Sequence, residues 1–259
     1  QSSSAFVTVA TDGSGDFCVF NSGATRLVWD QSATTALDAG SRLLDTRATG
    51  AMVPSGGTVV VRTSVPAAAT ILGTLTVLDP QSAGHTTVWP CSQGRPATSV
   101  NNVTAPGQRT VNSTAVTTDP DGSFCIYSSM AAHLVWDAQR GAPEIQAGAS
   151  QRVLDTRAGE PLAAEGELRV HAGPARATVA GNLTVVAPQG SGHTTVWTCG
   201  EQRPTASTNN FVVGETTPNF AVVRTDAAGD FCVYSTAQTH LLWDQAGAAP
   251  GFEAGSPVR

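Results

Sequence analysis

The segment GHTTVWPC at residues 84–91 decides the fold, because it returns almost unchanged as GHTTVWTC at residues 192–199. Each copy belongs to a longer set of motifs that recurs in the same order with a shift of 107 to 110 residues. The set comprises LLDTR or VLDTR at 43–47 and 153–157, Phe-Cys at 17–18, 124–125 and 231–232, and a run ending in Trp-Asp at 26–30, 133–137 and 240–244. A period of this length indicates tandem units, each large enough to bury its own core.

Short strand-like runs separated by turn residues fill each unit. TLTVL at 74–78 alternates polar and apolar residues, while TVVVRTSV at 58–65 and FCIYS at 124–128 are rich in β-branched and aromatic residues, which favour strands. Asp-Pro, Asp-Gly and Gly-Ser clusters interrupt these runs at spacings of about 8–12 residues, as in sandwiches and barrels. We therefore predict an all-β chain of tandem antiparallel β-sandwich domains, immunoglobulin-like or jelly-roll-like, with about seven or eight strands per unit and almost no helix.

The order of the motifs sets the expected domain limits. If the part from LDTR to Trp-x-Cys is called the first half, and the part from Phe-Cys to Trp-Asp the second half, the chain reads second, first, second, first, second. Residues 1–38 are then the second half of a preceding unit, 39–148 form unit 1, and 149–259 form unit 2 and end at the start of a further unit. This pattern is typical of a stretch of a longer array.

The surplus second half at residues 1–38 carries apolar side chains that need a covering surface. They are Phe17, Val19, Leu27, Val28 and Trp29. Because burial of one such side chain is worth about 1.5–3 kcal/mol, we expect the segment to pack against a first half. That first half is either residues 39–108 of the same chain, which would leave 215–259 as the surplus segment, or one on another polypeptide.

Composition narrows the classes of partner. All 14 basic residues are arginine, and the net charge is −6 at pH 7. Because nucleic-acid binding needs clustered Lys and Arg, these scattered arginines argue against a nucleic-acid partner. No apolar stretch approaches the roughly 18–20 residues of a membrane-spanning helix, so membrane insertion is not expected. Without lysine, a Schiff base or a Lys–Asn isopeptide bond cannot form, and covalent crosslinking is left to the five cysteines.

The motif order resembles a known kind of repeat. RLLDTR, a strand pair ending in TVWPC, an R-P-x-x-S-x-N-N segment, F-C-x-Y and H-L-x-x-D follow one another here. This order resembles repeats in secreted and wall-associated actinobacterial proteins, a poorly characterised family that implies a secreted, cell-surface location but little about function. Trp29, Trp136 and Trp243 depart from the small or aliphatic residue expected before the Asp, which leaves open a specialised surface.

The cysteines allow two regular pairing schemes. In the scheme we favour, Cys91 pairs with Cys125 and Cys199 with Cys232, within units that begin at LDTR. Each loop would then contribute roughly 3–4 kcal/mol in the chain-entropy model. The rival scheme joins Cys18 to Cys91 and Cys125 to Cys199, at separations that are equally regular. Under the favoured scheme Cys18 is left as a free thiol or an interchain bond.

Repeated polar residues have structural and functional interpretations. We expect Asp45 with Arg47, and Asp155 with Arg157, to be structural ion pairs that fix the start of each unit, with Asp137 or Asp244 nearby; the alternative is ligand recognition. His133 is replaced by Arg26 in the third copy, which argues against a catalytic or metal-binding histidine. Acidic turns at 12–16, 119–122 and 226–230 could offer oxygen ligands to calcium, but Asp-Gly is also ordinary turn chemistry. We therefore predict no metal site.

Trp89 and Trp197 are the candidate ligand or packing surface. Each follows a valine in a Thr-Thr-Val-Trp strand, so the two side chains must point to opposite faces of the sheet. An exposed indole would suit a sugar platform. The interpretation we favour is a core tryptophan beside the disulfide.

These features favour an extracellular structural or adhesive repeat protein of the bacterial surface, as part of a longer array or fibre. Its expected partners are other protein subunits or neighbours in the array. The alternative is a carbohydrate-binding module that recognises cell-wall or environmental glycans through exposed tryptophans. We expect no enzymatic activity and no cofactor, because no G-x-S-x-G elbow or other shared catalytic set is present.

Overall fold

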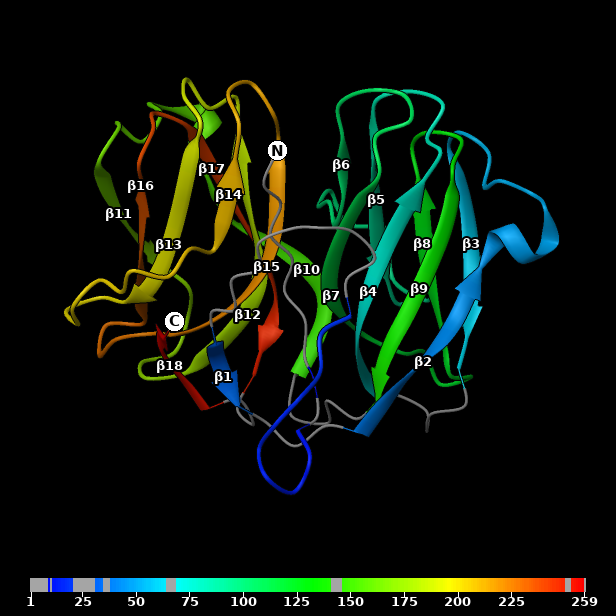
Figure 1. Cartoon of the computed structure of the whole chain (residues 1–259), viewed down its shortest axis with the longest axis horizontal. Helices are drawn as coiled ribbons and strands as arrows, with labels where there is room; N and C mark the ends of the chain where they lie inside the picture. The colour runs from blue at the N-terminus through cyan, green and yellow to red at the C-terminus, as the bar shows by residue number, and fades with distance from the viewer. Residues whose placement is uncertain are drawn as a thin grey trace.

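The computed structural model describes residues 9, 11–20, 31–34, 38–63, 69–140, 146–249 and 253–258. Within these ranges the chain is nearly all β, and every strand pairing is antiparallel. Two sandwich units lie side by side, each built from two four-stranded sheets (Figure 1). The all-β sandwich prediction is therefore confirmed.

Unit 1 contains eight strands in two sheets, ordered β2-β9-β4-β7 and β3-β8-β5-β6. The strands are β2 (Asp38–Asp45), β3 (Gly57–Arg62), β4 (Thr70–Leu78), β5 (Gly84–Trp89), β6 (Asn102–Val103), β7 (Thr110–Thr117), β8 (Ser123–Ser128) and β9 (His133–Arg140). Successive strands cross between the two sheets, except at β5–β6. Eight strands arranged in this way form a jelly roll, one of the two expected alternatives.

Unit 2 repeats this topology strand for strand, in sheets ordered β10-β17-β12-β15 and β11-β16-β13-β14. The strands are β10 (Gln146–Asp155), β11 (Gly166–His171), β12 (Thr178–Val186), β13 (Gly192–Thr198), β14 (Asn209–Phe211), β15 (Thr217–Arg224), β16 (Asp230–Ser235) and β17 (His240–Ala248). Helix among the described residues is limited to two 3-10 turns inside the LDTR motifs, η1 (Thr46–Thr49) and η2 (Thr156–Ala158).

The strand pairing places the unit limits slightly differently from the sequence. Each unit begins before its LDTR motif, because its first strand pairs with its last: β2 with β9, and β10 with β17. The expected limit between residues 148 and 149 therefore lies inside β10. The last strand of the chain, β18 (Glu253–Val258), does not join the sheets of unit 2 but pairs with β1 (Gln31–Thr34).

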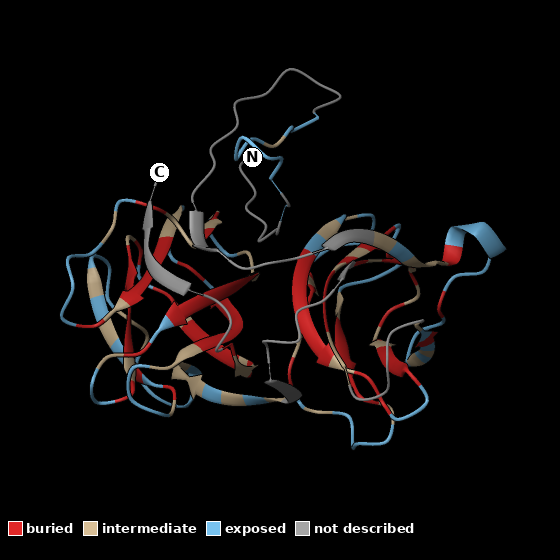
Figure 2. Cartoon of the chain, turned by 90° about the horizontal axis from the view of Figure 1, so that it is seen from below, coloured by how far each residue is buried: buried red, intermediate tan, exposed pale blue. Residues whose placement is uncertain are grey.

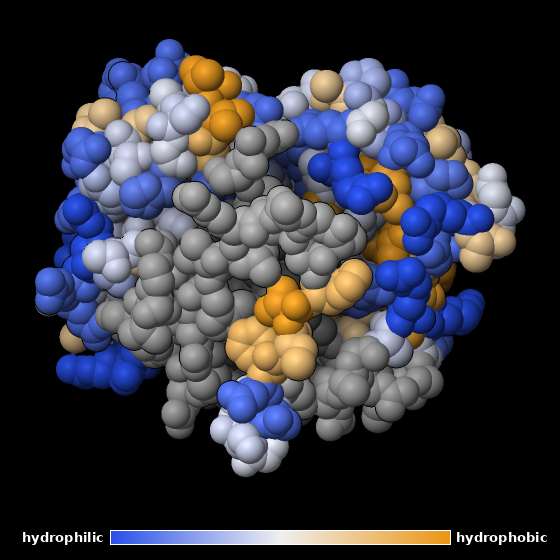
Figure 3. Space-filling model, viewed as in Figure 1, coloured by the Kyte–Doolittle hydropathy of each residue, from blue (hydrophilic) through white to orange (hydrophobic). Residues whose placement is uncertain are grey.

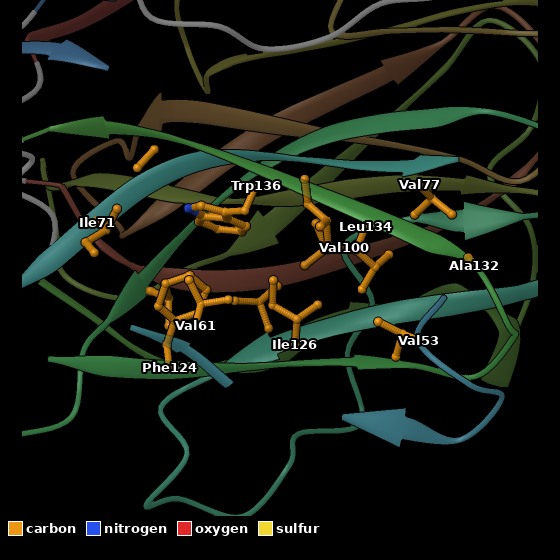
Figure 4. Packing of buried hydrophobic residues seen from close by; sticks show 14 of the residues in the cluster. Val53, Val61, Ile71, Val77, Val100, Phe124, Ile126, Ala132, Leu134 and Trp136 are labelled. Carbon is orange, nitrogen blue, oxygen red and sulfur yellow. The ribbon is translucent and has the colours of Figure 1, made fainter. Parts of the chain in front are cut away.

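The core of each unit is built around one tryptophan. Trp136 is fully buried against Phe124 in unit 1, with ring centroids 4.9 Å apart (Figure 4). Trp243 packs against Phe231 in the same way at 4.8 Å. The hypothesis of a specialised surface is therefore wrong for Trp136 and Trp243, since both side chains line the core. Trp29 lies outside the described residues. Figure 2 shows burial concentrated inside the two units.

A glycine on the neighbouring strand of the same sheet makes room for each core tryptophan. A Cβ atom added to Gly73 in β4 would lie 2.4 Å from Cζ2 of Trp136. One added to Gly181 in β12 would lie 2.8 Å from Cζ2 of Trp243 and 2.6 Å from the backbone oxygen of Asp244. Because contacts this short do not occur without displacement, the indole rings depend on these glycines.

β1 and β18, the first and last described strands of the chain, meet beside unit 2. β1 and β18 form a two-stranded sheet, and both strands contact β15. The described part of residues 1–38 therefore includes a strand that joins the C-terminal segment rather than either sheet of unit 1. Val19 is 60% exposed, and Leu27, Val28 and Trp29 lie outside the described residues.

Candidate functional site

The first candidate site is the interface between the units. β7 of unit 1 contacts all four strands of the β10-β17-β12-β15 sheet of unit 2. At its centre lies Asn112, which is fully buried. Its Nδ2 donates to Oδ1 of Asn182 (2.8 Å) and to the backbone oxygen of Val100 (2.7 Å), and its Oδ1 accepts from the backbone N–H of Phe220 (3.0 Å). One side chain therefore joins two strands of unit 2 to unit 1.

The face of unit 2 that β7 covers is buried although it points away from the core of that unit. Leu183 and Trp243 belong to the core cluster, so their neighbours along each strand must face outward. The outward residues, each at most 4% exposed, are Ala180, Thr184, Phe220, Val222 and Leu242. A mainly apolar face of this kind is typical of a fixed inter-domain contact.

An ion pair lies at the edge of the same interface. Arg152 donates to both carboxylate oxygens of Asp244, at 2.8 and 2.9 Å. The backbone N–H of Ser99 from unit 1 approaches Asp244 Oδ2 at 3.5 Å. The Asp244 side chain is only 1% exposed. A charge so deeply buried is stable only while its partner is in place.

The second candidate site is the outer face of the other sheet, which carries the disulfides. Cys91 is bonded to Cys125 and Cys199 to Cys232, with Cα atoms 5.0 Å apart in both pairs. The within-unit scheme is therefore confirmed, and the rival scheme through Cys18 is wrong. Each bond ties the end of one strand (β5 or β13) to its neighbour (β8 or β16). Cys18 is an exposed free thiol.

Trp89 and Trp197 lie on this outer face but are buried. Val88 and Val196 face the cores of their units, which sends each indole to the opposite side. There the indoles are only 6% and 4% exposed. Trp197 packs in a separate small cluster with Cys199, Cys232 and Tyr234. The indoles thus form a packing surface beside the disulfide, outside the sandwich core, and do not present a stacking platform.

An Arg–Tyr–His stack adjoins each buried tryptophan. The guanidinium carbon of Arg95 lies 3.7 Å from the ring centroid of Tyr127, and that of Arg203 lies 3.6 Å from that of Tyr234. The ring of His85 approaches Tyr127 at 5.8 Å. Burial and, secondarily, the positive charge of Arg95 lower the pKa of His85 below its ordinary value. Cation–π contact of this kind holds the Arg-Pro loops over the disulfide face.

Unit 2 has a hollow on this face, of about 310 Å³. Four charged side chains surround it, beside Trp197 and Cys232, and these are Glu167, Arg169, Glu201 and Arg203. Arg203 donates to Glu167 at 2.9 Å. The equivalent positions in unit 1 are Thr58, Val60, Gln93 and Arg95, so only one of these charges is common to both units.

The LDTR motifs form local ion pairs, as expected, but within a turn. Arg47 donates from Nη2 to Asp45 Oδ2 (2.7 Å), and its backbone N–H donates to Asp45 Oδ1 (3.1 Å). Asp155 and Arg157 repeat this geometry, with the side-chain contact at 2.6 Å. Hydrogen bonds from the arginines hold the pKa of both carboxyls at about 2. Each pair lies within a turn because the chain enters η1 or η2 at the motif, and Arg42 or Arg152 links the motif aspartate to Asp137 or Asp244 on the neighbouring strand.

The threonine of each LDTR motif makes the contact with the last strand. Thr46 Oγ1 accepts from the backbone N–H of Leu134 (2.9 Å) and lies 3.0 Å from Nδ1 of His133. Thr156 does the same with Leu241 and His240. Asp137 and Asp244 pair instead with Arg42 and Arg152, the arginines that precede each motif. These two histidines thus contact a structural threonine.

The acidic turns bond some carboxylate oxygens within the turn and others to neighbouring residues such as Ser92, Arg169 and His171. Asp226 Oδ1 accepts from the backbone N–H groups of Ala228 and Asp230, and Asp12 accepts from those of Ser14 and Asp16. No group of three or more His, Cys, Asp or Glu side chains able to hold a metal occurs in the part of the chain that the structure describes. Over the same residues, no helix is long and apolar enough to cross a membrane.

Asn112 and the two stacked arginines are the residues that sequence reasoning missed. Arg95 and Arg203 occupy matching places in the R-P-x-x-S-x-N-N segments, so their recurrence was a usable signal. No sequence signal pointed to Asn112, since its counterpart Asn219 donates to Thr208 inside its own unit. The role of Asn112 depends on its neighbour in space, and the sequence alone does not reveal that neighbour.

Comparisons with known proteins assign neither a family nor a function to this chain. No family model and no curated protein matches the sequence. Among solved structures, the chain is similar to the crystal structure of the STIV MCP, at 7% identity and a TM-score of 0.37, over 82% of this chain and 96% of that chain. It is also similar to the CBM22-1-CBM22-2 tandem domain of Paenibacillus barcinonensis Xyn10C, at 12% identity and a TM-score of 0.24, over 82% of this chain and 100% of that chain. Likenesses at this level assign no function.

Proposed function

We propose that this chain is an extracellular structural or adhesive repeat protein of the bacterial surface, in which jelly-roll units stack through a fixed interface. The observation that carries the proposal is the buried contact around Asn112, which joins unit 1 to two strands of unit 2. Domains that act independently are joined by exposed linkers with few contacts between them. A buried polar contact within an apolar face instead fixes one orientation of the two units, which suits a rigid rod or fibre.

Two disulfides support the extracellular part of this proposal. Stable disulfides persist in oxidising compartments and are rare in the cytosol. Both bonds lie on the outer sheet of their unit, where they tie strand ends together. The role we propose is non-catalytic, with protein neighbours in an array as the partners.

Rigidity between the units is the testable core of the proposal. Spin labels can be placed at Val60→Cys in β3 and Val153→Cys in β10, which are 51% and 38% exposed, in a Cys18→Ser background. We expect a single narrow distance distribution from pulsed electron resonance. Asn112→Ala should broaden it, whereas the matched variant Asn219→Ala should leave it narrow. A broad distribution in the protein with native Asn112 would overturn the structural proposal.

Glycan binding is the second candidate function, and the charged hollow of unit 2 favours it. Glu167, Glu201 and Arg203 line the hollow and offer polar groups that can hydrogen-bond sugar hydroxyls. The buried indole of Trp197 cannot provide the usual stacking surface. A glycan array separates the two candidates: binding that Glu201→Gln abolishes, and that Gln93→Ala at the matched position leaves intact, would favour the module. No binding above background would exclude the arrayed glycans as ligands.

A further inference from the structure

The terminal ribbon, made of β1 and β18, has the register of the first and last strands of a complete unit. In unit 2 these strands are β10 and β17. Adding two repeats of 107 residues to each β1 position, and subtracting one such repeat from each β18 position, converts each pair in the ribbon into a pair in unit 2. The matched pairs are Gln31↔Val258 with Gln245↔Gln151, Ala33↔Ala254 with Gly247↔Ala147, and Thr34↔Glu253 with Ala248↔Gln146. A strand slipped by one residue would match none of them.

The ribbon also occupies the place of a next unit. β18 contacts β15 and β13 of unit 2, as β10 contacts β7 and β5 of unit 1. Likewise, β1 contacts β15 as β17 contacts β7. The interface between units 1 and 2 is therefore repeated, in part, between unit 2 and the ribbon.

The turn at residues 12–16 is a third feature of a complete unit. Asp12 Oδ1 accepts from the N–H groups of Ser14 (2.8 Å) and Asp16 (3.0 Å). In unit 2, Asp226 accepts from Ala228 (2.7 Å) and Asp230 (3.0 Å). Gly15 and Gly229 even share a φ of 86°. The hairpin turn of the second half is thus formed at residues 12–16 as it is inside a sandwich.

The next four residues, 17–20, depart from the pattern. Their counterparts lie in β8 and β16, which are flanked on both sides by strands of a first half, β3 and β5 or β11 and β13. Residues 17–20 form no strand. Val19 is 60% exposed and Phe20 91%, whereas Ile126 and Val233, the counterparts of Val19, are fully buried. Figure 3 shows an apolar patch where Figure 1 places this segment.

Every feature of a unit that is absent here depends on a first half. The outer edge of β1 has no strand beside it among the described residues, although the matching edge of β17 pairs with β12. Cys18 is unbonded, although Cys232 is bonded to Cys199 at the end of β13. The turn, by contrast, forms within the second half, and the ribbon register needs only the opening strand of the next unit.

We propose that residues 11–20, β1 and β18 are parts of a third jelly-roll unit, whose partner is a first half of this repeat that the described residues do not contain. A strand of the β12 type would add to the edge of β1, and a strand of the β13 type would lie beside residues 17–20. This inference rests on the proposed array function and names its partner. Main-chain pairing along an exposed strand edge is an established mode of recognition.

A disulfide between Cys18 and the partner would then form across this contact. The thiol of Cys18 and that of the Trp-x-Cys cysteine on the partner lose two protons and two electrons as the S–S bond forms. A disulfide oxidant, glutathione disulfide in the assay below, accepts them and becomes two thiols. The product matches the bond between Cys199 and Cys232.

Peptide capture by the full chain tests the proposal. The probe is the octapeptide GHTTVWTC, the sequence of residues 192–199, in a glutathione redox buffer, with mass spectrometry of the mixed disulfide at Cys18. We expect a yield about tenfold above that of a scrambled octapeptide ending in Cys, because docking raises the effective thiol concentration. Adding a β12 peptide, TVAGNLTVV, should raise the yield further. Val19→Asp with Phe20→Ser should reduce it to the scrambled level.

Equal yields for the native and scrambled peptides would overturn the proposal, as would Cys18-linked dimers of the chain in place of the peptide adduct. The ribbon is tested separately by Ala33→Cys with Ala254→Cys in a Cys18→Ser background. The matched control is Ala147→Cys with Gly247→Cys, at the same register position in unit 2. Crosslinking of the control alone would also overturn the proposal. Neither outcome bears on the spin-label distances, so failure here is distinguishable from failure of the array function.

Discussion

In unit 2 the ion pair of Arg152 with Asp244 lies beneath unit 1, whereas its counterpart in unit 1, Arg42 with Asp137, is open to solvent. The side chains of the first pair are 26% and 1% exposed, and those of the second are 51% and 44% exposed. The bonding geometry is nearly the same, since both arginines donate from Nε and Nη2 at 2.7 to 3.0 Å. A repeated motif can therefore have very different energetic weight, according to what stacks on it.

The disulfide-bearing sheets of the two units also differ, in the charges on their outer faces. In unit 2 the β11 strand carries Glu167, Arg169 and His171, and the arginine and histidine both bond to Asp230. The matching strand of unit 1 carries Thr58, Val60 and Arg62. The disulfide face thus varies in charge from one unit to the next.

The largest expected difference between the units comes from removing one partner of the ion pair. Arg152→Met leaves the Asp244 carboxylate buried without its partner, and it should lower the free energy of unfolding by about 3–5 kcal/mol. The matched Arg42→Met should lower it by less than about 1 kcal/mol, since solvent screens the exposed Asp137. Urea unfolding followed by tryptophan fluorescence measures both. Equal losses would mean that stacking does not distinguish the two sites.

The glycines opposite the core tryptophans should show no such difference. Gly73→Ala and Gly181→Ala each place a methyl group against an indole, and overpacking of this kind typically lowers stability by about 1–3 kcal/mol. We expect similar losses in the two units, again measured by urea unfolding. Gly94→Ala is the control, because an added Cβ there meets nothing within 4 Å. A loss confined to one unit would show that the two cores are not equivalent.

Much of the fold could be predicted from the sequence because its signals are local. Alternation in TLTVL, turn residues at regular spacing and the repeat of GHTTVWPC all act within one unit, and they yielded the β-sandwich and the within-unit disulfides. Val88 and Trp89 could be assigned to opposite faces from the two-residue period of a strand. Which of the two faces points into the core could not be predicted, because both side chains are buried, one by the second sheet and one by the Arg-Pro loop.

Other features depend on contacts between segments far apart in the chain. The importance of Asn112 arises from Asn182 and Phe220 in the other unit, and that of Gly73 from an indole on a neighbouring strand. The pairing of β1 with β18 joins two strands more than 200 residues apart in the sequence. The repeat marked both segments as parts of incomplete units, but no local pattern specified that they would pair with each other.

A smaller difference concerns the indole N–H of the core tryptophans. Trp243 Nε1 donates to Gln245 Oε1 at 3.3 Å, while Trp136 Nε1 has no partner in the described structure and Ala138 occupies the matching position. Gln245 also donates to the backbone oxygen of Ala172 at 3.0 Å. Gln245→Ala should therefore lower the free energy of unfolding by about 1–2 kcal/mol, against a negligible change for the exposed Gln151→Ala. No change at Gln245 would show that the indole bond adds nothing to unit 2.

The smallest expected effect concerns the acid titration of the LDTR aspartates, Asp45 and Asp155. Here the two units should again agree. Hydrogen bonds from Arg47 and Arg157 hold the pKa of Asp45 and Asp155 at about 2, below the value of about 3.9 in an unfolded chain. Because the folded pKa is the lower one, the stabilisation is fully present above about pH 4 and is lost as the pH falls through about 2. Carboxyl carbon shifts measured by NMR from pH 5 to pH 1.5 should therefore give nearly equal midpoints for the two residues.

Arg47→Gln makes this comparison sharper, because it changes one unit and leaves the other as an internal reference. The variant removes the side-chain donors to Asp45 and should raise the Asp45 midpoint toward its ordinary value. Asp155 should titrate as before, because its own pair with Arg157 (2.6 Å) is untouched. If the Asp45 midpoint did not move, the neighbouring Arg42, 3.4 Å away, would be the group that holds the carboxylate charged. If both midpoints moved, the LDTR turns of the two units would be coupled through the interface at Asn112, and stacking would then affect even the motif that the two units share most closely.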